Sequence, residues 1–289
     1  MLIKRLSIIG VGLIGASLAS GLRKAGECDE VIGCGRGVEN LRKAVDLGII
    51  DRYYHDPILA VQGADMVIVA VPLGAMAKIF KSINNVLPPK AIITDVGSVK
   101  LSVINDARQY LTKHLPYFVP GHPIAGSEKS GVTAFNPNLF NNKKVILTST
   151  PETETEATAL VQNMWEIVGA KVVNMLADHH DKVLAATSHL PHLLAYSLVN
   201  TLAKMDSKTE IFQFAAGGFR DFTRIASSDP HMWHDICLAN QDAILHILQY
   251  FNNDLKQLIE AIQHQDSNKI EAIFSDAKTV RDELANNNS

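Results

Sequence analysis

One histidine stands out for the chemistry that its surroundings would allow. His122 lies between a glycine and a proline in the segment Gly-His-Pro-Ile-Ala-Gly-Ser-Glu-Lys-Ser-Gly, residues 121–131. Loop residues bracketed in this way are held rigidly and rarely lie in a core, so we expect the imidazole in a cleft. A neutral imidazole can accept a hydroxyl proton near physiological pH. Next to a hydride acceptor it would promote alcohol oxidation; the alternative is a capping or surface histidine.

A glycine pattern near the N-terminus predicts the partner for this chemistry. Residues 10–15 read Gly-Val-Gly-Leu-Ile-Gly, between a predicted strand and a predicted helix. In that setting the first glycine permits a tight turn, the second a close approach to a pyrophosphate, and the third close helix–strand packing. Amides at the helix N-terminus would bind phosphate. The residues predicted to contact a dinucleotide here are Gly10, Val11, Gly12, Leu13, Ile14 and Gly15, with Val71 and Pro72 after a later strand. The alternative is a turn without a ligand.

The end of the second predicted strand bears on which dinucleotide would bind. An acidic residue about 20 positions after the glycine loop usually holds the ribose hydroxyl of NAD. Gly35 and Arg36 stand there instead. Gly35 leaves room and Arg36 suits a 2′-phosphate, so we expect NADP or NAD, with a preference for NADP. In the alternative, Arg36 stacks on adenine and the cofactor is NAD.

Other polar residues could complete a site. Ser98 follows a predicted strand, where it would bond His122 or the cofactor, or cap the next helix. His189 and His192 lie three residues apart at a predicted helix start. That spacing could hold a metal, but no HExxH motif or nearby cysteine accompanies it, so we expect no metal. Contacts to an anionic substrate fit these residues better.

Two arginines follow in the second half. Arg220 and Arg224 are four residues apart, which predicts one helix face. Guanidinium groups bind carboxylates through two parallel hydrogen bonds, so the pair suits an acidic ligand. Alternatively, Asp221 and other acids neutralise them as surface ion pairs.

Composition narrows the possible classes of protein. The chain has 289 residues, 47 % of them hydrophobic, and a net charge of −3, so we expect neither nucleic acid nor a membrane as partner. Its three cysteines form no CxxC pair, which favours the reducing cytoplasm. An apolar run at residues 6–19 resembles a signal peptide, but its glycine spacing favours a strand, a loop and a helix.

The pattern of predicted elements changes near residue 174. Before it, short apolar runs alternate with helical patterns, which indicates βαβ units and a mostly parallel sheet. After it, apolar residues recur only at helical spacing, and Asp229 and Pro230 predict one helix start. We expect the α/β class, with an N-terminal Rossmann dinucleotide-binding domain at residues 1–174 and an all-helical domain at 175–289. The helical half is too apolar for its helices to stand alone, so we expect it to pack against a second copy of the chain in a homodimer.

Together these segments resemble the prephenate/arogenate dehydrogenase family of tyrosine biosynthesis. The resemblance is carried by GVGLIGAS at 10–17, DVGSVK at 95–100, GHPIAGSEKSG at 121–131, HLPH at 189–192 and GFRDFTRIASSDPHMW at 218–233. It implies an active site between a Rossmann domain and a helical dimerisation domain. The implied reaction is oxidative decarboxylation of prephenate to 4-hydroxyphenylpyruvate, or of arogenate to tyrosine, with hydride transfer to NAD or NADP.

The resemblance also implies roles for particular residues. His122 would hydrogen-bond the ring hydroxyl and take its proton, while Ser98 would orient the histidine or the hydroxyl. Arg224 would bind the ring carboxylate. The other implied substrate contacts are His189, His192, Glu128 as a polar gate, and Trp233, which would reach toward the partner subunit's site.

Two other functions fit part of the pattern. A β-hydroxyacid dehydrogenase has a similar architecture, but it would need a catalytic lysine where HLPH stands. A non-catalytic NAD(P)-sensing protein would leave His122, His192 and Arg224 without a use. The residues do not decide between prephenate and arogenate, or whether tyrosine inhibits. We expect neither a fused chorismate mutase nor a regulatory ACT domain.

Overall fold

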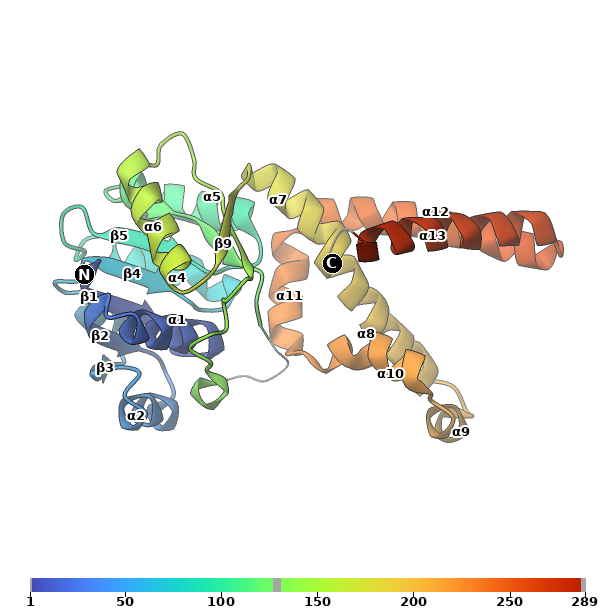
Figure 1. Cartoon of the computed structure of the whole chain (residues 1–289), viewed down its shortest axis with the longest axis horizontal. Coiled ribbons are helices and arrows are strands. Elements are labelled where there is room, and N and C mark those ends of the chain that lie inside the picture. Colours follow the sequence, from blue (N-terminus) through green and yellow to red (C-terminus); the bar gives the residue numbers. More distant parts are fainter. Residues whose placement is uncertain (1, 127–130, 287–289) are drawn as a thin grey trace. The chain divides into compact units, whose positions relative to one another are not determined.

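The computed structural model describes residues 2–126 and 131–286 (Figure 1). Contacts divide the chain into two compact units, Met1–Gln241 and Asp242–Ser289. The first unit extends past residue 174 because later helices pack on earlier ones: α7 (Ala177–Leu184) on α5 (Lys100–Tyr110), and α11 (Pro230–Ala239) on α4 (Leu73–Ile83).

The first unit is built on a six-stranded parallel sheet. The strands lie in the order β3 (Arg52–Tyr54), β2 (Cys28–Cys34), β1 (Ile3–Ile9), β4 (Met66–Val69), β5 (Ile92–Asp95) and β6 (Phe118–Val119). The central strands read as nearly continuous β-branched runs because both faces are covered. The strand order reverses between β1 and β4, and ligands of open α/β sheets bind at the carboxyl ends beside such a point.

Helices cover both faces of this sheet. On one face α1 (Leu13–Lys24), α2 (Val38–Asp46) and α6 (Thr155–Ile167) bury Leu18, Leu41 and Trp165 against the strands. On the other face α3 (Pro57–Ala60), α4 and α5 bury Ala60, Phe80 and Val103. Apolar side chains at helical spacing thus form two cores, one on each face, which hold the carboxyl edge of the sheet rigid.

A second, three-stranded sheet carries the histidine singled out above. It consists of β7 (Gly121–Pro123), β8 (Lys144–Leu147) and β9 (Lys171–Asn174), with β7 antiparallel to β8 and β8 parallel to β9. The expectation of a loop at residues 121–131 was therefore wrong for its first three residues. His122 pairs with Ile146 and is only 9 % exposed, because pairing with β8 satisfies the backbone and lets the segment be buried.

After β9 the described residues form no further strand, as expected. A nearly continuous helical run comprises α7, a π-helical segment at Ala185–His189, and α8 (Leu190–Ala203). The shorter elements that follow are α9 (Lys208–Gln213), α10 (Gly217–Thr223), a 3₁₀ turn at Arg224–Ser227, and α11. The predicted start of α11 is confirmed: the Asp229 side chain accepts a hydrogen bond from the backbone N–H of His231 at 2.8 Å.

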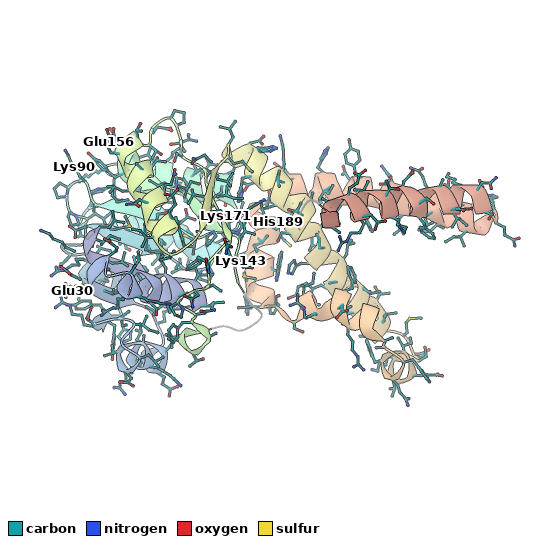
Figure 2. All side chains as sticks on the ribbon, viewed as in Figure 1. Glu30, Lys90, Lys143, Glu156, Lys171 and His189 are labelled. Atoms are coloured by element: carbon teal, nitrogen blue, oxygen red, sulfur yellow. The ribbon has the colours of Figure 1, made fainter. Side chains whose placement is uncertain are left out.

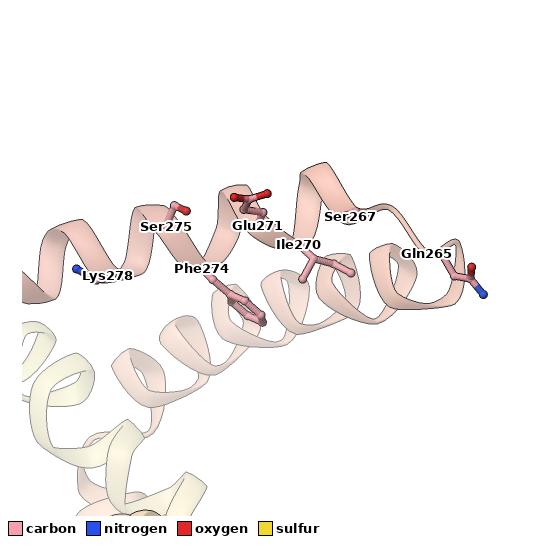
Figure 3. A pocket seen from close by; sticks show the side chains of 7 residues that line it. All are labelled: Gln265, Ser267, Ile270, Glu271, Phe274, Ser275 and Lys278. Carbon is pink, nitrogen blue, oxygen red and sulfur yellow. The ribbon is translucent and has the colours of Figure 1, made fainter.

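The second unit is a helical hairpin of α12 (Gln241–Gln263) and α13 (Ser267–Asn286). Ile270 and Phe274 of α13 point toward α12 beside a shallow hollow (Figure 3). Phe274 is nevertheless 56 % exposed, because two helices cannot enclose a large ring. Among the described residues no helix is long and apolar enough to cross a bilayer.

Candidate active site

A cleft of about 1010 Å³ opens at the carboxyl ends of β1, β2 and β4. Its wall includes most of the residues predicted to contact a dinucleotide: Gly10, Val11, Gly12, Gly35, Arg36, Val71 and Pro72. Leu13, Ile14 and Gly15 belong to the first turn of α1 and do not line it. The cleft therefore lies where the strand order of the sheet reverses.

The glycine loop has the geometry that a dinucleotide site requires. Gly10 has φ +103°, and a Cβ there would lie 2.1 Å from the carbonyl oxygen of Ala70. A Cβ on Gly15 would lie 2.6 Å from the carbonyl oxygen of Gly10, so α1 packs tightly behind the strand. A Cβ on Gly12 would meet nothing within 4 Å. Only the middle glycine faces open space, which is where a pyrophosphate would approach the backbone.

Residues that the sequence did not reveal hold this cleft together. Asn40 donates from Nδ2 to the carbonyl oxygen of Val11 at 2.7 Å, and its Oδ1 accepts from the backbone N–H of Val132 at 2.9 Å. Asp235 of α11 accepts from the backbone N–H of Gly74 at the start of α4, at 3.0 Å. These contacts link positions up to 161 residues apart, so no local sequence signal could have identified them.

The imidazole of His122 belongs to a buried chain of side chains. Its Nδ1 lies 2.8 Å from Nε2 of His180, and Nδ1 of His180 lies 2.7 Å from Oδ1 of Asp181. His180 and Asp181 sit on α7, and both are buried. Burial holds the pKa of His122 well below its ordinary value, and the neighbouring His180, Lys100 and His189 lower it further. His122 is therefore neutral at physiological pH and can act as a proton acceptor.

A buried ion pair fixes the strand that carries His122. Lys100 is fully buried, pairs with Asp95 at the end of β5, and donates from Nζ to the carbonyl oxygen of Gly121 at 2.7 Å. Asp95 accepts in turn from the backbone N–H of Gly121 at 3.2 Å and of Gly97 at 2.8 Å. Burial lowers the pKa of Lys100, while the carboxylate of Asp95 opposes that shift. The pair thus holds Gly121 by both of its backbone polar groups.

Ser98 neither bonds His122 nor caps α5, the two local roles that its position in the sequence allowed. The side chain that orients His122 is His180, and α5 is capped by Asp181, whose two carboxylate oxygens accept from the backbone N–H groups of Lys100 and Leu101. Ser98 itself is half-buried and forms no hydrogen bond to any described residue. The cap comes from 81 residues away because the start of α5 packs against α7.

The two histidines of HLPH lie at the junction between the π-helical segment and α8. His189, labelled in Figure 2, is buried, and burial lowers its pKa to about 4. Its Nδ1 lies 3.2 Å from Nδ2 of Asn240. His192 donates from Nδ1 to the carbonyl oxygen of Ser188 at 2.8 Å and stacks on Trp233 with 3.8 Å between ring centroids. Trp233 is thus buried within its own chain, and its reach toward a partner's site stays a prediction.

The arginine pair lies where α10 passes directly into a 3₁₀ turn. α10 ends at Thr223, so Arg220 lies on that helix while Arg224 begins the 3₁₀ turn that packs on α8. Thr223 and Arg224 both keep right-handed helical backbone angles, so the chain stays helical between the two arginines, and their shared face stays a prediction. Glu128 lies outside the described residues. In the described part of the chain, no three His, Cys, Asp or Glu side chains are grouped to hold a metal ion.

Comparison with known proteins identifies the family. A model of the prephenate dehydrogenase nucleotide-binding domain matches residues 18–174, and one of the prephenate dehydrogenase dimerization domain matches residues 176–276. This chain belongs to the prephenate dehydrogenase family. Cyclohexadienyl dehydrogenase of Zymomonas mobilis is 39 % identical over 96 % of this chain and 95 % of its own length. Prephenate dehydrogenase of Bacillus subtilis is 36 % identical over 96 % of this chain and 75 % of its own.

Solved structures in this family have the same fold. The crystal structure of prephenate dehydrogenase from A. aeolicus, in complex with hydroxyphenyl propionate and NAD+, superposes with a TM-score of 0.91. The two sequences are 38 % identical, and the match covers 97 % of this chain and 98 % of that one. The predicted family, and the α/β fold with a helical C-terminal part, are therefore confirmed. The main functional prediction is supported over the two alternatives.

Proposed function

We propose that this protein catalyses the oxidative decarboxylation of prephenate, arogenate or both, with a nicotinamide dinucleotide as hydride acceptor. The observation that carries the proposal is the neutral, buried His122 at the carboxyl edge of the parallel sheet. The backbone of Gly121 is bonded to Asp95 at the end of β5, and β5 neighbours β4, whose end borders the dinucleotide cleft. The strand that carries the proton acceptor is thus bonded to the end of β5, next to the strand that borders the cofactor cleft.

In the proposed mechanism, Nε2 of His122 accepts the proton of the ring hydroxyl. The nicotinamide, when bound, supplies the chemistry of hydride acceptance from the same ring carbon. Loss of the ring carboxylate as CO₂ then leaves an aromatic ring, which makes the overall reaction strongly downhill. We assign Arg224 to that carboxylate, Ser98 to the hydroxyl, and His189 and His192 to the substrate side chain. Glu128 as a gate and Trp233 as a contact complete the proposal.

The direct test mixes the protein with each of four combinations of prephenate or arogenate and NAD or NADP. We expect the absorbance of reduced nicotinamide to rise in at least one combination. Comparing kcat/KM across the four would identify the preferred substrate and cofactor. Dinucleotide binding without reduction in any combination would favour the NAD(P)-sensing alternative instead.

We further propose that the cofactor is NADP in preference to NAD. Arg36 and Lys78 line the cleft, while its carboxylates are engaged by backbone N–H groups: Asp56 caps α3 and Asp235 accepts from Gly74. This charge balance suits a 2′-phosphate.

Arg36→Ala is therefore expected to weaken NADP binding about 10- to 100-fold, the strength of one charge-assisted hydrogen bond, and to leave NAD binding unchanged. Fluorescence titration with each dinucleotide measures this, with Arg42→Ala on the exposed side of α2 as control. Equal effects on both dinucleotides would contradict the preference.

The role of Arg224 leads to a separate prediction. Removing a guanidinium that binds the ring carboxylate removes a charge-assisted contact that is present before the chemical step. Arg224→Ala is expected to raise KM for the substrate about 10- to 100-fold with a smaller change in kcat. Steady-state kinetics at saturating cofactor measure both. Arg220→Ala is the matched control, and a larger effect there would assign the carboxylate to the other arginine.

The assembly and the domain boundary remain proposals. The family model that matches residues 176–276 describes a dimerization domain, which supports a homodimer and a boundary near residue 174. Sedimentation as a monomer at micromolar concentration would contradict the dimer. The cytoplasm is the proposed location, since Cys28, Cys34 and Cys237 are all free.

A further inference from the structure

The directions of the hydrogen bonds that join Asp181, His180 and His122 can be deduced from the backbone. Asp181 accepts at Oδ1 from the N–H of Lys100 at 2.8 Å and at Oδ2 from the N–H of Leu101 at 2.9 Å. Backbone N–H groups can only donate, so both carboxylate oxygens act as acceptors. Asp181 thus bonds the first turn of α5 through both of its oxygens.

This arrangement determines the tautomer of His180. Its Nδ1 lies 2.7 Å from Oδ1 of Asp181, and a carboxylate cannot donate, so Nδ1 carries the hydrogen. In the neutral ring, Nε2 then carries the lone pair. That nitrogen lies 2.8 Å from Nδ1 of His122, which must be the donor in this bond. His122 therefore keeps its lone pair on Nε2.

We propose that His180 is a positioning residue for the reaction, and that Asp181 acts through it. His180 holds the ring of His122 in place and selects the tautomer whose Nε2 can take the substrate proton. The inference rests on the proposed function, and it adds the residues that make His122 a base. His180 is fully buried, and its two ring nitrogens link Asp181 directly to the proposed base.

The kinetic test removes the hydrogen-bond acceptor of His180 but keeps an aromatic ring at that position. His180→Phe removes both nitrogens, so His122 can adopt either tautomer, and kcat is expected to fall about 10²-fold, the lower end of what a positioned base contributes. KM and dinucleotide affinity should stay unchanged. His180→Gln offers an amide oxygen to His122 and should recover part of kcat. His179→Phe, on the exposed side of α7, is the matched control. An unchanged kcat in His180→Phe would overturn the proposal.

A second measurement is independent of turnover. In protein labelled with ¹⁵N-histidine, the proposal predicts that Nδ1 of His122 is protonated and Nε2 is not, with His122→Asn used to assign the signals. In folded His180→Phe this single tautomer should give way to a mixture. The reverse tautomer in the unaltered protein would overturn the inference. Because no substrate is involved, this result stands even if the proposed reaction is not observed. If His180→Phe fails to fold, the tautomer of His122 in the unaltered protein still tests the inference.

Discussion

In His122→Asn, kcat is expected to fall by about 10²- to 10⁴-fold while KM changes little. Asparagine can still donate to Nε2 of His180 from its amide, so the strand and its buried neighbours should keep their places. It cannot accept a proton from the substrate hydroxyl. The fall in kcat therefore measures the contribution of proton acceptance by His122, separately from its structural contacts. Steady-state kinetics, with thermal unfolding to verify the fold, measure it.

Two observations would count against this assignment. A kcat equal to that of the unaltered protein would refute it, and a rise in KM alone would make His122 a binding residue. The pH profile gives an additional check. Because burial holds the pKa of His122 well below the ordinary value, the base stays neutral as the pH falls through about 6.5. Activity should decline only at more acidic pH, where the ring takes up a proton.

Lys100→Met is expected to lower the free energy of unfolding by about 3–5 kcal/mol, because it leaves a buried carboxylate without its counter-charge. Asp95 would keep only the backbone N–H groups of Gly97 and Gly121, and the carbonyl oxygen of Gly121 would lose its donor. Urea unfolding followed by circular dichroism measures the change. Activity should also fall, since Gly121 precedes His122 on β7.

The control for this prediction is Lys143→Met, at an exposed lysine near β8 (Figure 2). Its stability should stay within about 0.5 kcal/mol of the unaltered protein. Asp95→Asn combined with Lys100→Met should recover part of the lost stability, because an uncharged amide needs no counter-ion. If Lys100→Met proved as stable as Lys143→Met, the ion pair would not be what holds β7.

Sequence reasoning succeeded where structure depends on nearby residues. The turn at Gly10, the packing of Gly15 and the cap at Asp229 are each decided within a few positions, so their residue types reveal them. Alternating strands and helices likewise predicted the parallel sheet. His122 was singled out by its neighbours Gly121 and Pro123, and its role as a base stays a prediction.

The sequence could not predict how His122 is held. The segment at 121–131 has the composition of a loop, and only pairing with β8 makes its start a strand. His180 and Asp181 have no recognisable motif around them, and nothing local indicates that α7 packs on the start of α5. Lysine side chains are rarely buried, so nothing in the sequence placed Lys100 in the interior. Its burial is explained by the ion pair with Asp95.

The remote cap on α5 has a consequence for how such proteins can evolve. The nucleotide-binding half of this chain is not self-contained. The hydrogen-bond acceptor for the first turn of α5 is Asp181, which lies 81 positions after Lys100. A recombinant that kept residues 1–174 and gained an unrelated C-terminal half would leave two amides of α5 without an acceptor. The two halves are therefore expected to be inherited together, and a viable exchange would have to bring its own carboxylate to the same place.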